Sequence, residues 1–272
     1  MIAASIVTYK TSTEELADCL RCLTACEFIS IIDVVDNASQ QSLKDYLSAN
    51  FPGVNYIPNV NNGYGAGNNI SIRRSLQHPD LKYHIVLNSD ILFEPSAVTI
   101  LKQKLDNDES IGLIMPAVVG RDRLPLTSCH PLPSPVDLLL HRFTSDRLLK
   151  CWRDNYDLCA QNFKRDTDVP YMCGSFLFFR LDALRHVGLF DERFFMYPED
   201  IDITRRVHRH YKTIVTPDTT ITHYHRAESR HNMRMLRIHA WNMLKYFAKW
   251  GFVFDGERRE FNRQLYKDLS LP

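Results

Sequence analysis

Strand-like and helix-like patterns of hydrophobic residues alternate at the start of the chain. Residues 2–7 form an apolar run of strand composition that ends at the polar residue Thr8. A helical pattern follows, with Thr13 as its expected N-cap and two glutamates in its first turn. A second apolar strand, residues 31–35, ends at Asp36. This order predicts a β-α-β unit, so the carboxyl ends of both strands should lie at the same edge of a parallel sheet.

A third strand is predicted within the segment YHIVLNSD, residues 83–90. Its apolar run, residues 85–87, is broken by Asn88, Ser89 and Asp90. Ligands of α/β sheets bind at the carboxyl ends of the strands, and a carboxylate there can hold a divalent cation against a diphosphate. The alternative is that Asp90 is a turn residue that caps the next helix.

Asp36 is a second candidate for ligand binding. A carboxylate at a strand end can accept a hydrogen bond from the ring N–H of a pyrimidine or from a ribose hydroxyl. The sequence Asp36-Asn37-Ala38-Ser39 is also typical of a turn, so both interpretations stay open.

The segment NVNNGYGAGNN, residues 59–69, is rich in glycine and asparagine. Glycine allows positive φ angles and a close approach of backbone to a ligand. The segment matches neither the P-loop pattern nor the G-x-G-x-x-G spacing. We therefore expect a loop, with a planar or phosphorylated ligand as one possible neighbour.

An acidic cluster follows an aromatic run in the second half of the chain. Residues 176–179 are a hydrophobic strand, and Glu199, Asp200 and Asp202 come after the run FFMYP. The three acids fit the first turn of a helix, where the helix dipole favours negative charge. An acid beside apolar surface also has a raised pKa and becomes a usable general base.

Together these segments resemble the family 2 glycosyltransferases of the GT-A fold, and most closely their bacterial rhamnosyltransferase-like branch, which builds cell-surface polysaccharides. The resemblance extends from about Ile2 to about Gly251. It is carried by the ordered motifs SIVTYK, VVDNAS, NNGYGAGNN, VLNSD, CGSFLFFR, VGLFDERFFMYPEDID and HYHRAES.

The resemblance implies a role for individual residues. Asp36 would face the base of a nucleotide donor, and the other residues implied in donor binding are Thr8, Tyr9, Asn37, Gly63, Asn68, Asn88 and Ser89. Asp200 matches the catalytic base, with Glu199 as the alternative. Gly174, Asp202 and His223 would lie near the acceptor or the donor sugar.

A divalent cation, Mn²⁺ or Mg²⁺, is implied as the cofactor. Asp90 matches the last acid of the family's Asp-x-Asp motif, and His225, with His223 as the second choice, would complete the metal site. The first acid of the motif is replaced by Asn88. The loss of one negative charge should weaken metal binding.

The predicted fold is therefore α/β: a GT-A domain over residues 1–225, with a mostly parallel central sheet flanked by helices. Residues 1–120 would bind the nucleotide, residues 121–225 would form the acceptor and catalytic half, and residues 226–272 would be a C-terminal helical appendage.

The expected function is inverting transfer of a sugar, first of all rhamnose from dTDP-rhamnose, to a saccharide or lipid-linked saccharide. Two alternatives remain. A sugar nucleotidyltransferase also needs acids at strand ends, but it would want a basic glycine-rich signature near the N-terminus. A nucleotide-binding pseudoenzyme would keep Asp36 and the glycine-rich segment, but it would have no use for the Glu199–Asp200 pair.

Composition indicates which partners and which cellular compartment to expect for the protein. The net charge of +1 does not favour a nucleic acid partner. We expect a cytoplasmic protein, because the first residues form a strand and no apolar run reaches about 18 residues. Seven cysteines, an odd number, fit a reducing compartment. Cys19, Cys22 and Cys26 share one face of the predicted helix, and we interpret them as core residues in preference to metal ligands.

Two further regions have no assigned chemistry. Residues 121–168 are proline-rich and predicted to be irregular, as a loop on the acceptor side or an insertion. Residues 226–250 combine basic with aromatic and aliphatic residues. That helix either packs its apolar stripe on the domain, which we favour, or makes peripheral contact with the inner face of the cell membrane.

Overall fold

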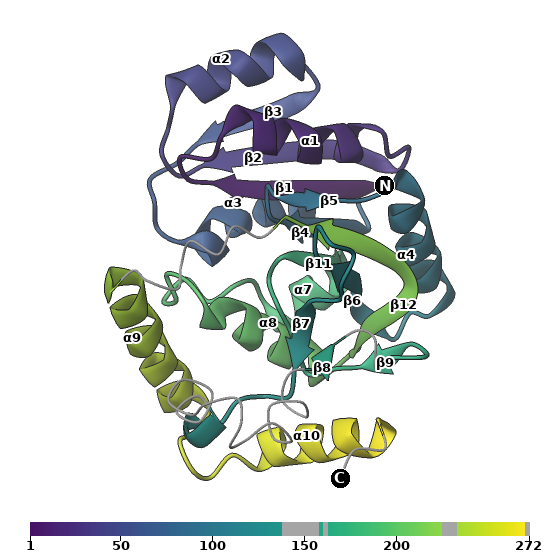
Figure 1. Ribbon diagram of the computed structural model, residues 1–272, viewed down its shortest axis with the longest axis vertical. Helices are drawn as coiled ribbons and strands as arrows, with labels where there is room; N and C mark the ends of the chain where they lie inside the picture. Colours follow the sequence, from purple (N-terminus) through teal and green to yellow (C-terminus); the bar gives the residue numbers. More distant parts are fainter. Residues whose placement is uncertain (138–157, 160–162, 225–232, 270–272) are drawn as a thin grey trace.

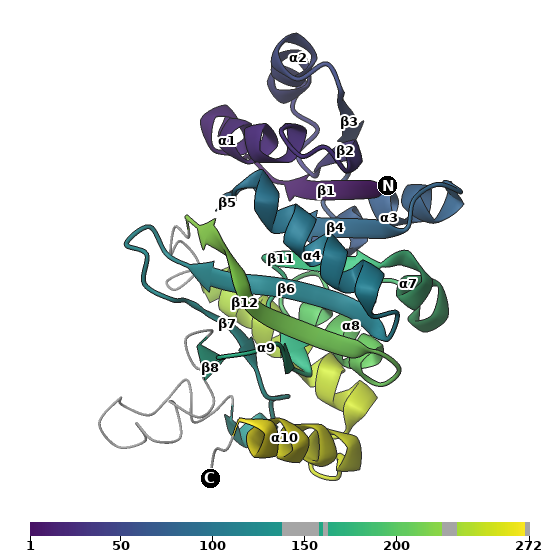
Figure 2. The ribbon, with the colours of Figure 1, turned by 90° about the vertical axis from the view of Figure 1, so that its right-hand side faces the viewer.

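The computed structural model describes the chain except for residues 138–157, 160–162, 225–232 and 270–272 (Figure 1). Within the described residues, one nine-stranded sheet forms the centre of the molecule. Helices cover both of its faces, with α1 (Thr13–Thr24) and α4 (Pro95–Asn107) on one side and α3 (Tyr64–Gln77) and α7 (Leu181–Val187) on the other (Figure 2). The predicted α/β fold with helices on both faces is confirmed.

The first half of the sheet is parallel. Its strands are ordered β3 (Val54–Pro58), β2 (Ile29–Asp36), β1 (Ile2–Thr8) and β4 (Tyr83–Leu87). Helix α2 (Gln41–Asn50) connects β2 with β3. The register pairs Thr8 with Asp36, so the two strand ends meet at one edge, as predicted.

The second half is joined to β4 through β11 (Phe176–Arg180), which runs antiparallel to both of its neighbours. Beyond β11, β6 (Ile111–Val119) pairs in parallel with the long strand β12 (Lys212–His223). Two short strands, β5 (Ile91–Leu92) and β9 (Thr167–Asp168), pair antiparallel with β12. Because five consecutive core positions of β4 and four of β11 are buried, the middle of the sheet is apolar on both faces.

Several local predictions need correction. Ser12, and not Thr13, is the N-cap of α1: its hydroxyl accepts a hydrogen bond from the Glu15 N–H. The glycine-rich segment is a loop only up to Gly63, because α3 begins at Tyr64. Residues 121–168 are not uniformly irregular. They contribute β9 and the strands β7 (Thr127–His130) and β8 (Leu158–Cys159), which form a small sheet with β10 (Tyr171–Met172).

The cysteines of the first helix belong to the core, as expected. Cys19 is buried among core side chains, Cys22 is partly buried against them, and Cys26 is buried just after the end of α1. No group of three side chains able to hold a metal ion occurs among the described residues.

The C-terminal helices α9 (Met233–Trp250) and α10 (Gly256–Asp268) pack against α8 (Pro198–His208) and the segment before it. A second apolar cluster forms this contact, and its buried members are Leu132, Phe194, Ile201, Met243, Tyr246 and Phe247. Part of the apolar stripe of α9 is therefore packed on the domain, while Met233, Trp241 and Leu244 stay exposed. None of the described helices is long and apolar enough to cross a membrane.

A buried arginine ties α8 to the loop between α9 and α10. The Arg205 guanidinium donates to both carboxylate oxygens of Asp255 at 2.8 and 2.6 Å and to Glu257 at 2.8 Å. The ring of Trp250 lies 4.1 Å from the guanidinium carbon. The Arg205 and Asp255 side chains are 1% and 3% exposed, so neither can exchange its partner for water.

We predict that Asp255→Ala lowers the free energy of unfolding by about 3–5 kcal/mol, because it leaves the Arg205 charge buried without its main partner. Urea unfolding measures the change. As a matched control on the same helix, Glu260→Ala removes the exposed pair with Arg263 and should change stability by about 0–1 kcal/mol. Asp255 also caps α10 by accepting from the Arg258 N–H, so Asp255→Asn, which keeps a side-chain acceptor, tests the charge alone. Equal stability of the Asp255 and Glu260 variants would contradict the assignment.

Candidate active site

The carboxylate of Asp36 is buried at the end of β2 and is already engaged. Its Oδ1 accepts from the Ala38 N–H at 2.9 Å and, at 3.5 Å, from the Thr8 hydroxyl. Its Oδ2 accepts from the Gln40 N–H at 2.7 Å and from the Tyr56 hydroxyl at 3.0 Å. These contacts give Asp36 the turn role that the sequence also suggested. A contact with a nucleotide base stays a prediction.

Asn37 organises the loop that leads into α3. Its amide nitrogen donates to the Gly63 carbonyl at 3.3 Å, and its amide oxygen accepts from Asn59 at 2.7 Å. Gly63 has φ +109°, and a Cβ there would lie 2.2 Å from the Phe195 carbonyl oxygen. The Tyr64 N–H donates to that same carbonyl at 3.0 Å. The glycine therefore lets the loop before α3 touch the segment before α8.

The other two glycines of this segment serve helix packing. A Cβ at Gly65 would lie 2.9 Å from Phe190, and one at Gly67 would lie 2.9 Å from Val7 on β1. Asn68, one turn into α3, is fully buried, and its amide oxygen accepts from the Ser5 hydroxyl at 2.8 Å. The structure thus places Asn68 inside the domain, below the sheet edge where a donor is expected.

Asn68 is one end of a buried polar chain. The Ser5 hydroxyl also lies 2.9 Å from His84 Nε2, and the Ser75 hydroxyl lies 2.9 Å from His84 Nδ1. Burial lowers the pKa of His84 to about 3, so the imidazole is neutral and can donate with one nitrogen and accept with the other.

Asp90 stands at the turn between β4 and β5, opposite the end of β12. Its carboxylate Oδ1 lies 3.2 Å from His223 Nε2, and its carbonyl accepts from the Tyr224 N–H at 2.9 Å. The Asn88 N–H donates to the Ser175 carbonyl at 3.0 Å, which ties this turn to β11. His223 is thus brought to Asp90. His225, the first choice for the metal site, lies outside the described residues.

A cavity of about 440 Å³ opens beside Asp90. It is lined by Ser12, Glu14, Glu15, Asp18, Asp90, Leu92, Arg121 and Tyr224. The Arg121 guanidinium stacks 4.3 Å above the Tyr224 ring, and the Ser89 hydroxyl donates to Glu15 at 2.7 Å. Four carboxyl groups against one arginine make this region strongly negative, so a diphosphate held close to it would require a cation.

A second group of polar side chains surrounds Gly174. The Tyr64 hydroxyl donates to the Gly174 carbonyl at 2.7 Å, and the Gly174 N–H donates to Asp200 Oδ2 at 2.9 Å. Asp200 Oδ1 accepts from the Ile201 N–H at 2.8 Å. A Cβ at Gly174 would lie 3.4 Å from the Asp200 Cβ and 3.5 Å from the Tyr64 ring. Gly174 therefore joins α3 to the first turn of α8.

Burial perturbs both acids of the Glu199–Asp200 pair. It raises the pKa of Asp200 to about 7, although the N–H groups of Gly174 and Ile201 act in the opposite direction. It also raises the pKa of Glu199 well above its usual range, and the neighbouring Asp200 charge adds to the shift. Glu199 is buried, and its Oε2 has no hydrogen-bond partner among the described residues, whereas Asp200 is partly exposed. Asp200 is thus the member of the pair that a substrate can reach.

Tyr64 lies between these groups. Burial raises the pKa of its phenol, and the charges of Glu199, Asp200 and Asp90 raise it further. The sequence pattern marks the glycines on either side of Tyr64 and not the tyrosine itself. Its place between two glycines of a conspicuous motif was the available signal.

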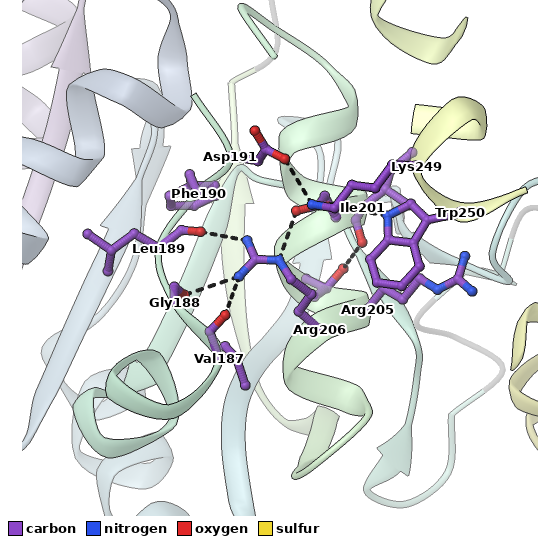
Figure 3. Close-up of polar contacts among 12 residues, drawn as sticks. Val187, Gly188, Leu189, Phe190, Asp191, Ile201, Arg205, Arg206, Lys249 and Trp250 are labelled. Carbon is purple, nitrogen blue, oxygen red and sulfur yellow. Dashed lines mark hydrogen bonds and ion pairs between the residues drawn. The ribbon is translucent and has the colours of Figure 1, made fainter. Parts of the chain in front are cut away.

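Asp202 faces away from this group. Its Oδ2 accepts from Arg206 at 2.9 Å, and its Oδ1 accepts from the Trp250 indole N–H at 2.8 Å and from Lys249 at 2.7 Å. Arg206 also donates to the carbonyls of Val187, Gly188 and Leu189 (Figure 3). These contacts give the Asp202 carboxylate a role in fixing α8 to α9 and, through Arg206, to the preceding loop. Its place beside the sugar or acceptor stays a prediction.

The inner side of α9 holds the backbone just before the acid pair. The buried Asn242 side chain donates to the Met196 carbonyl at 3.0 Å, and Lys245 donates to the Arg193 carbonyl at 2.9 Å. Between these carbonyls and α8, Tyr197 has φ +90° and ψ −76°, a γ-turn conformation that is strained for a residue with a side chain. A strained conformation persists only when the surrounding structure stabilises it. Asn242 and Lys245 contribute by fixing the backbone just before Tyr197. No sequence pattern marked either residue.

Comparison with known proteins agrees with this geometry. The solved structure of GalNAc-T7 with UDP, GalNAc and Mn²⁺ superposes on 99% of this chain and 55% of its own, with a TM-score of 0.62 and 14% identity. The mannosyltransferase PcManGT of Pyrobaculum calidifontis, in complex with GDP-Man and Mn²⁺, superposes on 91% of this chain and 63% of its own, with a TM-score of 0.57 and 15% identity. The architecture is that of the GT-A glycosyltransferases.

The sequence places the chain more narrowly. Residues 5–188 match the profile of glycosyl transferase family 2, and the chain belongs to that family. It is 28% identical over 205 residues to the low-salt glycan biosynthesis hexosyltransferase Agl10 of Haloferax volcanii. It is 26% identical over 209 residues to the N-acetylglucosaminyl-diphospho-decaprenol L-rhamnosyltransferase of Mycobacterium tuberculosis. These matches cover 75% and 72% of this chain, but only 60% and 66% of the relatives' own lengths.

A third relative matches over more of its length. The rhamnosyltransferase WbbL of Escherichia coli is 25% identical over 228 residues, which are 80% of this chain and 82% of that protein. The resemblance to family 2 and to rhamnosyltransferases, inferred from the ordered motifs, is confirmed.

We predict that Gly63→Ala impairs turnover, because the added methyl group would collide with the Phe195 carbonyl at a positive φ angle. A shift of about 1 Å at such a contact can lower turnover by roughly 10²-fold. Gly53→Ala is the matched control, since a Cβ there meets no atom within 4 Å. Sugar transfer and urea unfolding of both variants separate loss of activity from loss of fold. Full activity of Gly63→Ala would show that this contact does not position the site.

The raised pKa values also predict how stability depends on pH. Where the folded protein binds a proton that the unfolded chain has lost, stability falls as pH rises. For Asp200 this window extends from the ordinary aspartate pKa of 3.8 to about 7. The free energy of unfolding of the wild type should therefore decline between about pH 4 and 7, and Asp200→Asn should show a shallower decline. Urea unfolding across this range, with the exposed Glu109→Gln as control, tests it. Parallel curves for the wild type and Asp200→Asn would contradict the assignment.

Proposed function

We propose that the chain is a metal-dependent inverting glycosyltransferase that moves a hexosyl or deoxyhexosyl group from a nucleoside diphosphate to a saccharide hydroxyl. The observation that carries the proposal is the partly exposed Asp200 carboxyl, whose pKa is raised to about 7 and which is fixed by the Gly174 N–H. Membership of family 2 supports sugar transfer as the reaction class.

The residues near the end of β4 fit a divalent cation. Asp90 offers a carboxylate and His223 an imidazole 3.2 Å away, and Mn²⁺ accepts both kinds of ligand. Ions of the Mg²⁺ type are commonly held by one or two carboxylates together with substrate phosphate oxygens, so two protein ligands suffice. When bound, the ion supplies Lewis-acid stabilisation of the negative charge on a leaving diphosphate. His225 remains our proposal for a further ligand.

Residues of this chain would activate the acceptor hydroxyl. Asp200 Oδ2 or Oδ1 accepts the proton of the acceptor hydroxyl as the oxygen attacks the anomeric carbon from the face opposite the leaving group, which inverts the configuration. A pKa near the working pH suits a general base, because a large fraction is ionised while the group stays basic enough. Glu199 is buried beside it and is assigned a positioning role.

The donor site is proposed at the edge formed by the ends of β1, β2 and β4. Thr8, exposed Tyr9, Asp36 and Asn37 would form the nucleoside side, with Gly63, Asn88 and Ser89 toward the diphosphate. The names of two relatives favour rhamnose as the sugar, and we propose dTDP-rhamnose as its donor. The name of the Mycobacterium tuberculosis relative favours a lipid-linked saccharide as the acceptor.

The test separates donor binding from chemistry with two variants in two assays. Calorimetry measures binding of dTDP, UDP and GDP with and without Mn²⁺, and product analysis measures the new glycosidic bond. We expect Asp90→Ala to lose the metal-enhanced nucleotide binding. We expect Asp200→Asn to bind nucleotide as the wild type does and to turn over roughly 10²–10⁴-fold more slowly.

The opposite pattern would overturn the roles assigned. Near-normal turnover of Asp200→Asn would remove Asp200 as the base. Binding of nucleotide that is indifferent to Mn²⁺, with no transfer to any acceptor, would favour the non-catalytic nucleotide-binding protein that Asn88 in the metal motif keeps as an alternative.

A further inference from the structure

The outer side of α9 and the loop after it expose an unusual amount of apolar surface. The described part of the chain has eleven exposed large hydrophobic side chains, and six of them lie between residues 233 and 254. These six, which we call the apolar ridge, are Met233, Trp241, Leu244, Phe252, Val253 and Phe254. Scattered single residues need no explanation, but a contiguous set marks an interaction surface.

The helical members of the ridge share one face. Met233, Trp241 and Leu244 are spaced by eight and three residues, which at about 100° per residue places them within one third of the helix circumference. The adjoining face of the helix carries the buried Met243, Tyr246 and Phe247. Loop and helix adjoin, because the Phe252 ring packs 5.8 Å from that of Phe247. Phe254, at the tip of the loop, is 89% exposed.

The charged side chains in the segment that carries the ridge are all basic. Between residues 233 and 254 the sequence has four basic residues, Arg234, Arg237, Lys245 and Lys249, and no acidic residue. Lys245 and Lys249 turn inward to Arg193 and to Asp191 and Asp202. Arg237 is exposed, and helical spacing puts it on the same face as Trp241 and Leu244.

We propose that the apolar ridge and Arg237 dock the protein on a lipid bilayer that contains anionic headgroups. A helix with one packed face and an outer face of Trp, Leu and Arg fits the boundary between headgroups and acyl chains, where the indole can keep its N–H in a polar layer. Anionic lipids complement the positive charge. A second copy of the chain fits less well, because a symmetric contact would bring two positively charged surfaces together.

Docking through the apolar ridge would place the bilayer close to the Glu199–Asp200 pair. The inner face of α9 binds the Met196 and Arg193 carbonyls, just ahead of the Glu199–Asp200 pair. Only the thickness of one helix, about 10–12 Å, separates the bilayer from that backbone. If the acceptor is lipid-linked, as the proposed function holds, docking would bring its saccharide to Asp200.

Vesicle binding tests docking without donor or acceptor, so it is independent of the proposed transfer. The full chain is sedimented with vesicles of phosphatidylcholine alone or mixed with phosphatidylglycerol, and tryptophan emission is recorded in parallel. We expect binding to the anionic vesicles that weakens in high salt, with a blue shift of the emission. The double variants Trp241→Ser/Leu244→Ser and Phe252→Ser/Phe254→Ser should each bind about tenfold more weakly or worse.

Matched variants test separately whether the charge of Arg237 and the exposed apolar side chains cause the binding to vesicles. Arg237→Glu should abolish the preference for anionic vesicles, while Lys44→Glu on α2 should leave it intact. Leu124→Ser, which changes an equally exposed side chain elsewhere, should bind as the wild type does. Urea unfolding confirms that each variant is folded.

Three results would overturn the proposal. They are no binding of the wild type to anionic vesicles, undiminished binding by both double variants, and a concentration-dependent dimer that the same variants dissociate. The last result would assign the ridge to a second copy of the chain.

Discussion

The contact between Gly63 and Phe195 joins the two halves of the site. At this point the loop before α3 meets the segment before α8 so closely that no side chain fits, and the Tyr64 N–H is bonded to the Phe195 carbonyl. Tyr64, the residue after Gly63, donates to the Gly174 carbonyl, and the Gly174 N–H donates to Asp200 in the first turn of α8. A displacement of either backbone would therefore change the position of the acid and of the phenol together.

The fold keeps two adjacent carboxyl groups, Glu199 and Asp200, in surroundings that disfavour their charge. Burial disfavours the ionised forms of the two adjacent carboxyls at the start of α8, of which Asp200 stays partly exposed. Two backbone N–H groups favour the ionised form of Asp200, which keeps its pKa near 7. The opposing stabilisation comes from further along the same helix, where Arg205 and Arg206 fix α8 to the C-terminal helices and to the loop at 187–189. The first turn of α8 thus carries the acid pair, and its last turn carries the arginines that hold the helix in place.

The sequence was informative where chemistry coincides with the end of a strand or the start of a helix. The pairing of Thr8 with Asp36, the turn at Asp90 and the start of α8 at Glu199–Asp200 all follow from hydrophobic runs that end in polar residues. Prediction was poorer where two residues have equal local preferences, as with Ser12 and Thr13 at the cap of α1. It failed where a role is purely tertiary. Asn242 and Lys245, which bind backbone carbonyls ahead of the acid pair, look like ordinary positions of an amphipathic helix.

The antiparallel strand β11 also governs the order in which the chain can fold. Strands β1 to β4 come from consecutive short units, but β4 pairs on its far side only with β11, which is completed at residue 180. Strands β6 and β12 reach the first half of the sheet only through that same strand. During synthesis, the apolar edge of β4 must therefore wait for about 90 further residues, and during that time it is open to pairing with other chains. The strand that completes the sheet is thus also the one that ends its exposure to aggregation.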